Sequence, residues 1–260
     1  MTSGSAVVIF QFGALCLGSR ALGQPVSKGL EFEIASVKPA NPDVRTSNVL
    51  LGEGESLTIV NVPLRKIITY AYDIRDFQLA GGPGWIGVER YDIAAKTAAG
   101  GRPASEPSPE TDDQRKDRVL RVRERLRSLL ADRFGLHAHF EQRERTVLRL
   151  RIAKGGPKLS EVTSPQGRVS TLDGHIQGYG APVSMLATQL SLATGLVVED
   201  ETGLSGKYDF VVDWAPDNAD PSDSRPSIFT AVSQLGLRLE RANGPVNILI
   251  IDHVERPSAN

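Results

Sequence analysis

The chain has only four histidines, and two of them stand close enough in sequence to share a site. His137 and His139 lie two apart in a stretch that alternates like a β-strand, so both imidazoles are expected on one face. Some zinc sites use this spacing, but a third ligand is required. His175 and His253 are the candidates, and neither has an HExxH-like context. His137, His139 and His253 are therefore metal ligands only under the alternative of a hydrolase, and the simpler expectation is a solvent-facing polar row.

Other catalytic groupings have less support. No Gly-x-Ser-x-Gly elbow is present, and the only cysteine, Cys16, lies in a leader segment described below. Asp252 and His253 are neighbours, so on a strand they would point to opposite faces. Carboxylates are scattered, and no pair with the separation of a glycosidase can be named. The sequence assigns no catalytic residue and implies no cofactor, which favours a protein that is not an enzyme.

Two features suit binding instead. Trp85 follows a glycine–proline turn and could be a ligand platform, although an aromatic that closes the core under a loop is the commoner arrangement. On a helix expected from 113 to 134, Arg118, Arg121 and Arg125 share one stripe at helical spacing. This stripe suits docking to an acidic partner or to lipid headgroups. The alternative, which we favour, is a solvated face with ion pairs between residues four apart.

The first 23 residues resemble an export signal. Ala6 to Gly18 is uncharged and mostly apolar, and Ala21 and Gly23 are the small residues that a signal peptidase requires. We expect cleavage after Gly23, which removes Cys16 and places the protein in the periplasm or outside the cell. No later run is long and apolar enough for a membrane helix, so no transmembrane segment is expected in the mature chain.

Composition excludes several classes of protein. The 260 residues carry 30 Lys+Arg against 31 Asp+Glu and are 40% hydrophobic, which is ordinary for a globular chain. A formal net charge of -1 provides no overall field to attract nucleic acid, and no base-reading motif is present. Any partner must therefore be recognised by a local site, and we expect no nucleic acid.

The chain is expected to contain an internal duplication. Asn61–Leu64 matches Gly180–Val183, and each segment opens an amphipathic helix with proline at its start. A strand, a polar loop and a second helix ending at Gly135 or Gly236 then follow in both halves. Each half is expected to close with two strands, and Asn243–Gly244 predicts a hairpin turn between the last two.

The predicted fold class is α+β. Each half is a β-α-β-loop-α-β-β unit with a small, mostly antiparallel sheet and helices on one face. The expected divisions are a signal peptide over 1–23, a first unit over 30–160, a linker over 161–174 and a second unit over 175–257.

Six short segments together resemble a large family of exported soil-bacterial proteins of unknown function, some of them joined to antirepressor-type metallopeptidases. The resemblance covers nearly the whole mature chain and implies no catalytic residues. The segments are Phe32–Pro39, Ala80–Trp85, Leu129–Phe134, Ala153–Leu159, Thr202–Phe210 and Ile251–Ser258.

A more distant resemblance concerns the second half. Thr194–Val198, the Gly206–Lys207 turn and Leu235–Leu237 are similar to the short N-terminal domain of secretins and TonB-dependent receptors, although no barrel or pore segment is attached here. Those modules bind other proteins. We therefore expect an exported protein- or peptide-binding module of the bacterial envelope that uses its strand edges or the groove between halves. The alternatives are an extracytoplasmic hydrolase, with or without a metal, and the sensor domain of an envelope signalling system.

Overall fold

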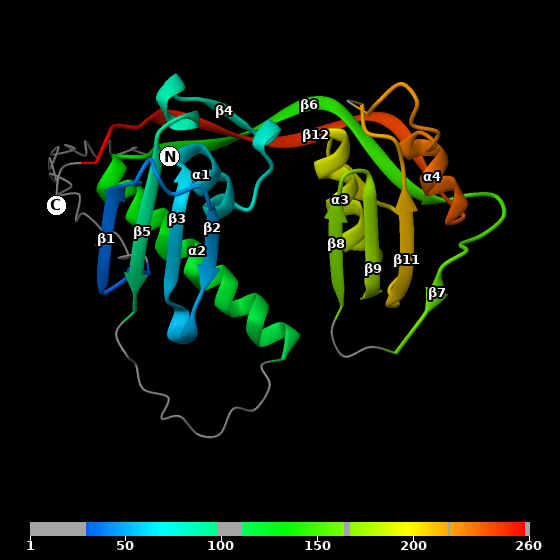
Figure 1. Cartoon of the computed structure of the whole chain (residues 1–260), viewed down its shortest axis with the longest axis horizontal. Coiled ribbons are helices and arrows are strands. Elements are labelled where there is room, and N and C mark those ends of the chain that lie inside the picture. The colour runs from blue at the N-terminus through cyan, green and yellow to red at the C-terminus, as the bar shows by residue number, and fades with distance from the viewer. Residues whose placement is uncertain (1–29, 98–110, 164–166, 218, 258–260) are drawn as a thin grey trace, which may run out of the picture.

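The computed structural model describes residues 30–97, 111–163, 167–217 and 219–257. Two lobes are joined along one side by a long two-stranded ribbon (Figure 1). The expected signal peptide, including Cys16, lies outside the described residues. None of the described helices is long and apolar enough to span a membrane.

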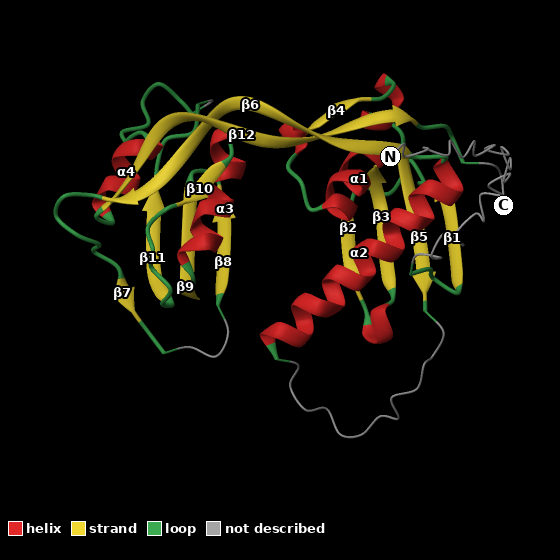
Figure 2. Cartoon of the chain, turned by 180° about the vertical axis from the view of Figure 1, so that it is seen from behind, coloured by secondary structure: helices red, strands yellow, loops and turns green. Residues whose placement is uncertain are grey.

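The first lobe is a four-stranded antiparallel sheet in the order β1-β5-β3-β2, covered on one face by helices α1 and α2 (Figure 2). A short 3-10 turn, η1 (Glu53–Glu55), joins β2 to β3, and η3 (Gly84–Gly87) precedes β5. The other elements are β1 (Ile34–Pro39), β2 (Asn48–Leu51), β3 (Leu57–Pro63), β5 (Arg90–Lys96), α1 (Leu64–Tyr72) and α2 (Asp112–Phe134).

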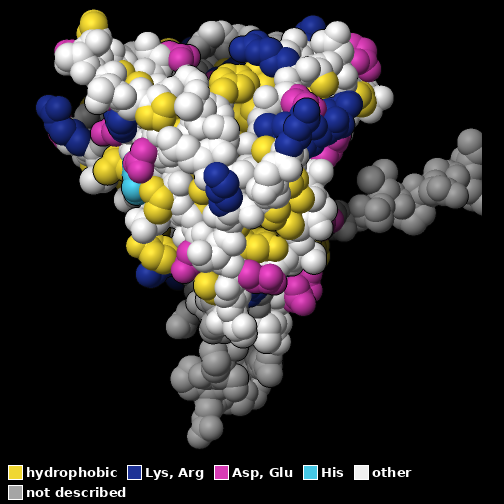
Figure 3. All heavy atoms as spheres, turned by 90° about the vertical axis from the view of Figure 1, so that its right-hand side faces the viewer, with side chains coloured by type: hydrophobic (Ala, Val, Ile, Leu, Met, Phe, Trp, Pro, Cys, Tyr) yellow, Lys and Arg dark blue, Asp and Glu magenta, His cyan; other side chains and the backbone are white. Residues whose placement is uncertain are grey.

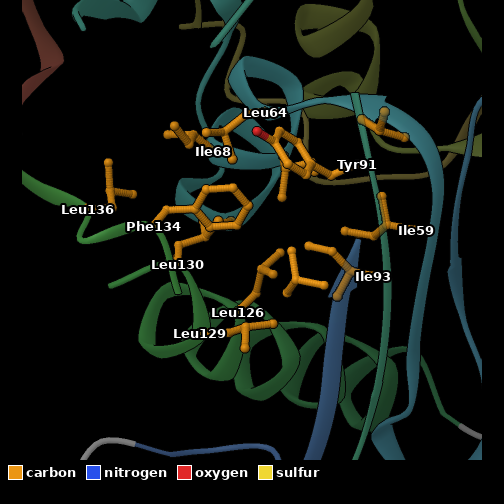
Figure 4. Packing of buried hydrophobic residues seen from close by; sticks show 14 of the residues in the cluster. Ile59, Leu64, Ile68, Tyr91, Ile93, Leu126, Leu129, Leu130, Phe134 and Leu136 are labelled. Atoms are coloured by element: carbon orange, nitrogen blue, oxygen red, sulfur yellow. The ribbon is translucent and has the colours of Figure 1, made fainter. Parts of the chain in front are cut away.

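Apolar side chains from the sheet and both helices form the core of this lobe (Figure 4). Phe134, at the end of α2, is fully buried and meets the Tyr91 ring edge-on with centroids 5.0 Å apart. Gly135 ends α2 in the left-handed conformation (φ 55°), as the sequence predicts, because a side chain disfavours that geometry.

The second lobe has a sheet in the matching order β7-β11-β9-β8, with α3 and α4 on one face. The predicted α+β class, with small, mostly antiparallel sheets, is confirmed. Residues 161–174, expected as a linker, include β8, which pairs with β9. The elements are β7 (Ser160–Glu161), β8 (Arg168–Leu172), β9 (His175–Ala181), β11 (Tyr208–Asp213), α3 (Val183–Thr194) and α4 (Ile228–Gln234).

The same backbone bulge opens the first helix of each lobe. Asn61 and Gly180 both have φ of 53°, two residues before the proline–helix junction. The N–H of Asn61 donates to Asp92 Oδ1 at 2.7 Å, and the N–H of Gly180 donates to Asp209 Oδ1 at 2.7 Å. The bulge leaves one backbone N–H without a partner in the strand ladder, and in both lobes an aspartate side chain accepts a hydrogen bond from it. Whether the halves arose by duplication stays a prediction.

The expected hairpin at Asn243–Gly244 is wrong, and neither half closes with two separate strands. β6 (His137–Ile152) and β12 (Leu237–His253) are each one continuous strand, and they pair with each other antiparallel along their lengths. Asn243 lies opposite Thr146, and neither Asn243 nor Gly244 has the positive φ that a type I′ turn requires. Pairing between distant strands overrides the local turn signal. Each strand pairs over more residues with the other strand than it could by folding back on itself. We call β6 and β12 the crossing ribbon.

Each lobe contains strand segments from both halves of the chain. β4 (Leu79–Gly81) pairs in parallel with β12 at Leu249–Ile251, and β10 (Val198–Asp200) pairs in parallel with β6 at Leu148–Leu150. The C-terminal part of β6 therefore lies in the second lobe, and the C-terminal part of β12 lies in the first. At the crossing the two strands bury a small separate cluster of Val147, Val246 and Ile248. The two lobes are therefore joined by one four-stranded sheet, in the order β10-β6-β12-β4.

Candidate functional site

Trp85 is covered by a charged side chain. The Arg256 guanidinium lies 4.9 Å from the centre of its ring and is held by Glu89 through hydrogen bonds of 2.6 to 3.1 Å. Tyr91 donates to the same carboxylate at 3.0 Å. Burial, together with this hydrogen bond to Glu89, raises the pKa of Tyr91 to about 12. Trp85 also packs against the first core, so the geometry places it between core and C-terminal tail.

The arginine stripe of α2 reaches the turn η1. Arg121 Nε lies 2.6 Å from Glu55 Oε1, and Arg125 Nη1 contacts Glu55 Oε2. Arg118 donates to the carbonyl of Gly52 at 3.4 Å, and Arg125 also donates to the carbonyl of Glu31. Glu55 has a left-handed backbone (φ 63°) and a mostly buried side chain. The three predicted binding arginines are thus brought together, and they contact Glu55 and backbone carbonyls of the protein itself.

His139 bridges two carboxylates on the ribbon. Its Nδ1 lies 2.8 Å from Asp252 Oδ2, and its Nε2 lies 3.3 Å from Glu141 Oε1. Hydrogen bonds to Asp252 and then to Glu141 raise the pKa of His139 above its ordinary value. With both ring nitrogens donating to carboxylates, the protonated imidazole is the form that fits, and such a ring offers no lone pair to a metal.

The other two predicted histidines lie nearby. His137 and His253 face each other across the ribbon with ring centroids 6.1 Å apart, and His137 Nδ1 lies 2.9 Å from the carbonyl of Gly135. His175 lies in the second lobe against Asp213. Within the described ranges, no three His, Cys, Asp or Glu side chains are grouped to hold a metal ion.

The inner edges of the two sheets face each other across the region between the lobes. β2 and β8 are the end strands nearest the opposite lobe (Figure 1), and no described strand pairs with their outer sides. Each carries an exposed leucine on the uncovered face of its sheet: Leu50 is 56% exposed and Leu172 is 72% exposed. Their backbone groups are available to a further strand.

A pocket of about 300 Å³ lies at the crossing. It is bounded by the turn η2 (Asp76–Gln78) of the first lobe, the segment 195–197 of the second lobe and both ribbon strands. We call it the crossing pocket. Its lining residues are Phe77, Arg145, Thr146, Gly195, Leu196, Val197, Val246 and Ile248.

Hydrogen bonds position the first-lobe wall of this pocket. Arg65, on α1, donates to the carbonyls of Asp76 at 2.8 Å and Leu79 at 2.9 Å, and its Nε reaches Asp76 Oδ1 at 3.1 Å. Gln78 donates to the carbonyl of Asn247 on β12 at 3.1 Å. Phe77, between these anchored residues, is therefore held against the ribbon.

A second pocket, of about 510 Å³, lies within the second lobe between the ends of α3 and α4. Its lining includes Asp173 and Asp217 as well as Arg241, whose guanidinium lies over the Phe229 ring. Charges of both signs thus line this pocket. On the end face of the second lobe, basic and acidic side chains lie together and apolar side chains form separate patches (Figure 3).

The crossing-pocket residues were not found from sequence. Phe77 stands two residues before β4, and Leu196 stands two residues before β10. This equivalent position in the two halves is the sequence signal that could have indicated the pocket. It could not be used because neither short strand was expected. Arg145 lies in the middle of β6, where two separate strands are expected, so the sequence does not predict its place on a continuous ribbon.

The fold and these sites define a two-lobed α+β protein with open strand edges and an apolar pocket. The chain belongs to the family described as protein of unknown function (DUF3738), which matches residues 65–254. The matched region includes both ribbon strands completely, and it includes the crossing pocket. No curated protein and no solved structure matches the chain.

Proposed function

We propose that the protein is an exported, non-enzymatic module that binds an extended peptide segment of an envelope protein by strand addition. One observation carries this proposal: β2 and β8, the two sheet edges that face each other, have no described strand on their outer sides and carry exposed leucines. An unpaired edge offers main-chain hydrogen bonds to an incoming strand, and neighbouring side chains select its sequence.

The four sheet edges differ in their protection. The outer edge β1 ends in Lys38 and Pro39, and β7 is only two residues long. Charges, proline and short length are the usual means by which proteins prevent edge pairing. β2, with the sequence Asn-Val-Leu-Leu, has no charge and no proline, and β8 has one charge, Arg168, which lies over the Tyr179 ring. The contrast favours the inner edges as the binding edges.

Lysine substitution on the inner edges tests the proposal. Tagged protein is purified from the native envelope after crosslinking, and partners of the wild type are compared with those of Leu50→Lys and Leu172→Lys. We expect a reproducible partner that at least one of these variants loses, because a charge at the edge opposes strand addition.

Leu120→Lys is the matched control for that experiment. Leu120 is 58% exposed on α2, so the same change is made at a similar exposure away from any sheet edge. The control is expected to keep the partner. Absence of any reproducible partner, or equal loss with all three variants, would contradict the proposal.

Export is the second part of the proposal and has its own test. The uncharged segment Ala6–Gly18 and the small residues Ala21 and Gly23 support it. We expect the protein isolated from its own cells to begin at Gln24 and to occur in the periplasmic or extracellular fraction. Mass spectrometry that finds an intact N-terminus on cytoplasmic protein would overturn this part and leave the edge-binding part standing.

A further inference from the structure

The crossing pocket lies where equivalent parts of the two lobes meet. Phe77 comes from the first lobe and Leu196 from the second, each two residues before its short parallel strand. Arg145 and Val246 stand ten residues after Gly135 and Gly236, the left-handed glycines that follow the helices. One of these two matched ribbon positions thus carries a cation and the other an apolar side chain.

The lining is apolar apart from one charge and one hydroxyl. Phe77, Leu196, Val197, Val246 and Ile248 provide the hydrocarbon surface, and Val246 and Ile248 are buried. No acidic residue lines the pocket. A volume of about 300 Å³ is at the lower end of the range for small-molecule sites.

Arg145 differs from four other arginines of the ribbon, which lie beside carboxylates, while Arg241 on β12 lies over the Phe229 ring. Arg143 is held by Glu141 at 2.7 Å, Arg151 by Glu201 at 2.5 Å and Arg238 by Glu240 at 2.6 Å. Arg149 is likewise within 3.4 Å of a carboxylate. In the part of the chain that the structure describes, Arg145 has no such partner. Its guanidinium is therefore a cation without a counter-charge at the rim of an apolar pocket.

We propose that the crossing pocket binds a monocarboxylate with a medium-length hydrocarbon chain. The chain occupies the space between Phe77, Leu196 and Ile248, and the carboxylate accepts hydrogen bonds from the Arg145 guanidinium. Charge-assisted bonds of this kind are about twice as strong as neutral ones and specify an anionic head. The site is separate from the strand edges of the proposed function.

Octanoate is the probe for this site. Isothermal titration of the full mature chain, residues 24–260, measures octanoate, octan-1-ol and octylamine in parallel. We expect octanoate to bind with one molecule per chain, octan-1-ol to bind about tenfold more weakly and octylamine not to bind, since only the carboxylate pairs with Arg145. Bound octanoate should also raise the melting temperature, because the native pocket binds it and the unfolded chain does not.

Two variants and one control separate charge from apolar contact. Arg145→Gln should weaken octanoate about tenfold and leave octan-1-ol unchanged. Phe77→Ala should weaken both, because it removes a wall that they share. Arg143→Gln makes the same charge change two residues away on β6 and should leave octanoate binding unchanged. Octanoate that fails to bind the wild type, or that binds Arg145→Gln as tightly, would overturn the proposal.

Discussion

Side chains that looked suited to chemistry are used here to hold strands and turns together. His139 was a metal candidate, and the structure places it between Asp252 and Glu141, with a hydrogen bond to each. Arg121 and Arg125 were docking candidates, and both reach Glu55. A sequence shows the residue types and their shared face, but it does not show which carboxylate comes opposite them from a distant strand or turn.

The His139 bridge predicts a pH-dependent contribution to stability. Its pKa is raised in the folded protein, so the contribution is fully present below the ordinary value of about 6.5 and is lost as pH rises through the raised value. Melting temperatures of wild type and His139→Gln should therefore differ more at about pH 5.5 than at about pH 8.5. Asp252→Asn, which removes the principal partner, should reduce that difference. A difference in melting temperature between wild type and His139→Gln that grows with rising pH would contradict the bridge.

At the scale of elements, the turn η1 is attached to α2 mainly through Glu55. Its carboxylate meets two guanidinium groups whose side chains are partly or mostly buried. Glu55→Gln keeps the shape and removes the charge, and we expect the free energy of unfolding in urea to fall by about 1–3 kcal/mol. Lys116→Gln, in an exposed pair with Asp113 on the same helix, should change it by less than about 0.5 kcal/mol. Equal changes in the free energy of unfolding for Glu55→Gln and Lys116→Gln would contradict the role of Glu55 in holding η1 against α2.

The middle of β12 supplies a second element-scale prediction. Asn243 is exposed on a continuous strand and lacks positive φ. Asn243→Thr should leave the free energy of unfolding unchanged or raise it by up to about 1 kcal/mol, because threonine favours strands. In a type I′ turn the same change would place a β-branched residue in the left-handed region and would be destabilising. Chemical denaturation distinguishes the two, and a loss above about 1 kcal/mol would contradict the strand.

Local signals predicted elements well and their pairing badly. Pro63 and Pro182 marked the starts of α1 and α3, and Gly135 marked the end of α2, because these positions depend on neighbouring backbone alone. The Asn243–Gly244 turn failed because strand pairing depends on a partner about a hundred residues away. The short strands β4 and β10 were missed for the same reason, and with them the crossing pocket.

At the scale of the whole molecule, the crossing ribbon joins the lobes and creates both candidate sites. It places β2 and β8 on facing edges, and it brings Phe77 and Leu196 to one pocket. If each strand instead folded back as a hairpin, the lobes would share no strands and the pocket would have no floor. The continuous ribbon is therefore the central claim, on which both proposals depend.

A pair of engineered cysteines tests that claim most directly. In a chain with Cys16→Ser, Gln142→Cys and Asn247→Cys stand directly opposite each other on β6 and β12, within the range that a disulfide spans. We predict that this pair oxidises readily to an intramolecular disulfide in the folded protein. The matched pair Gln142→Cys and Thr146→Cys lies about 13 Å apart along one strand and should stay reduced. Oxidation of the second pair and not the first would show hairpins and contradict the ribbon.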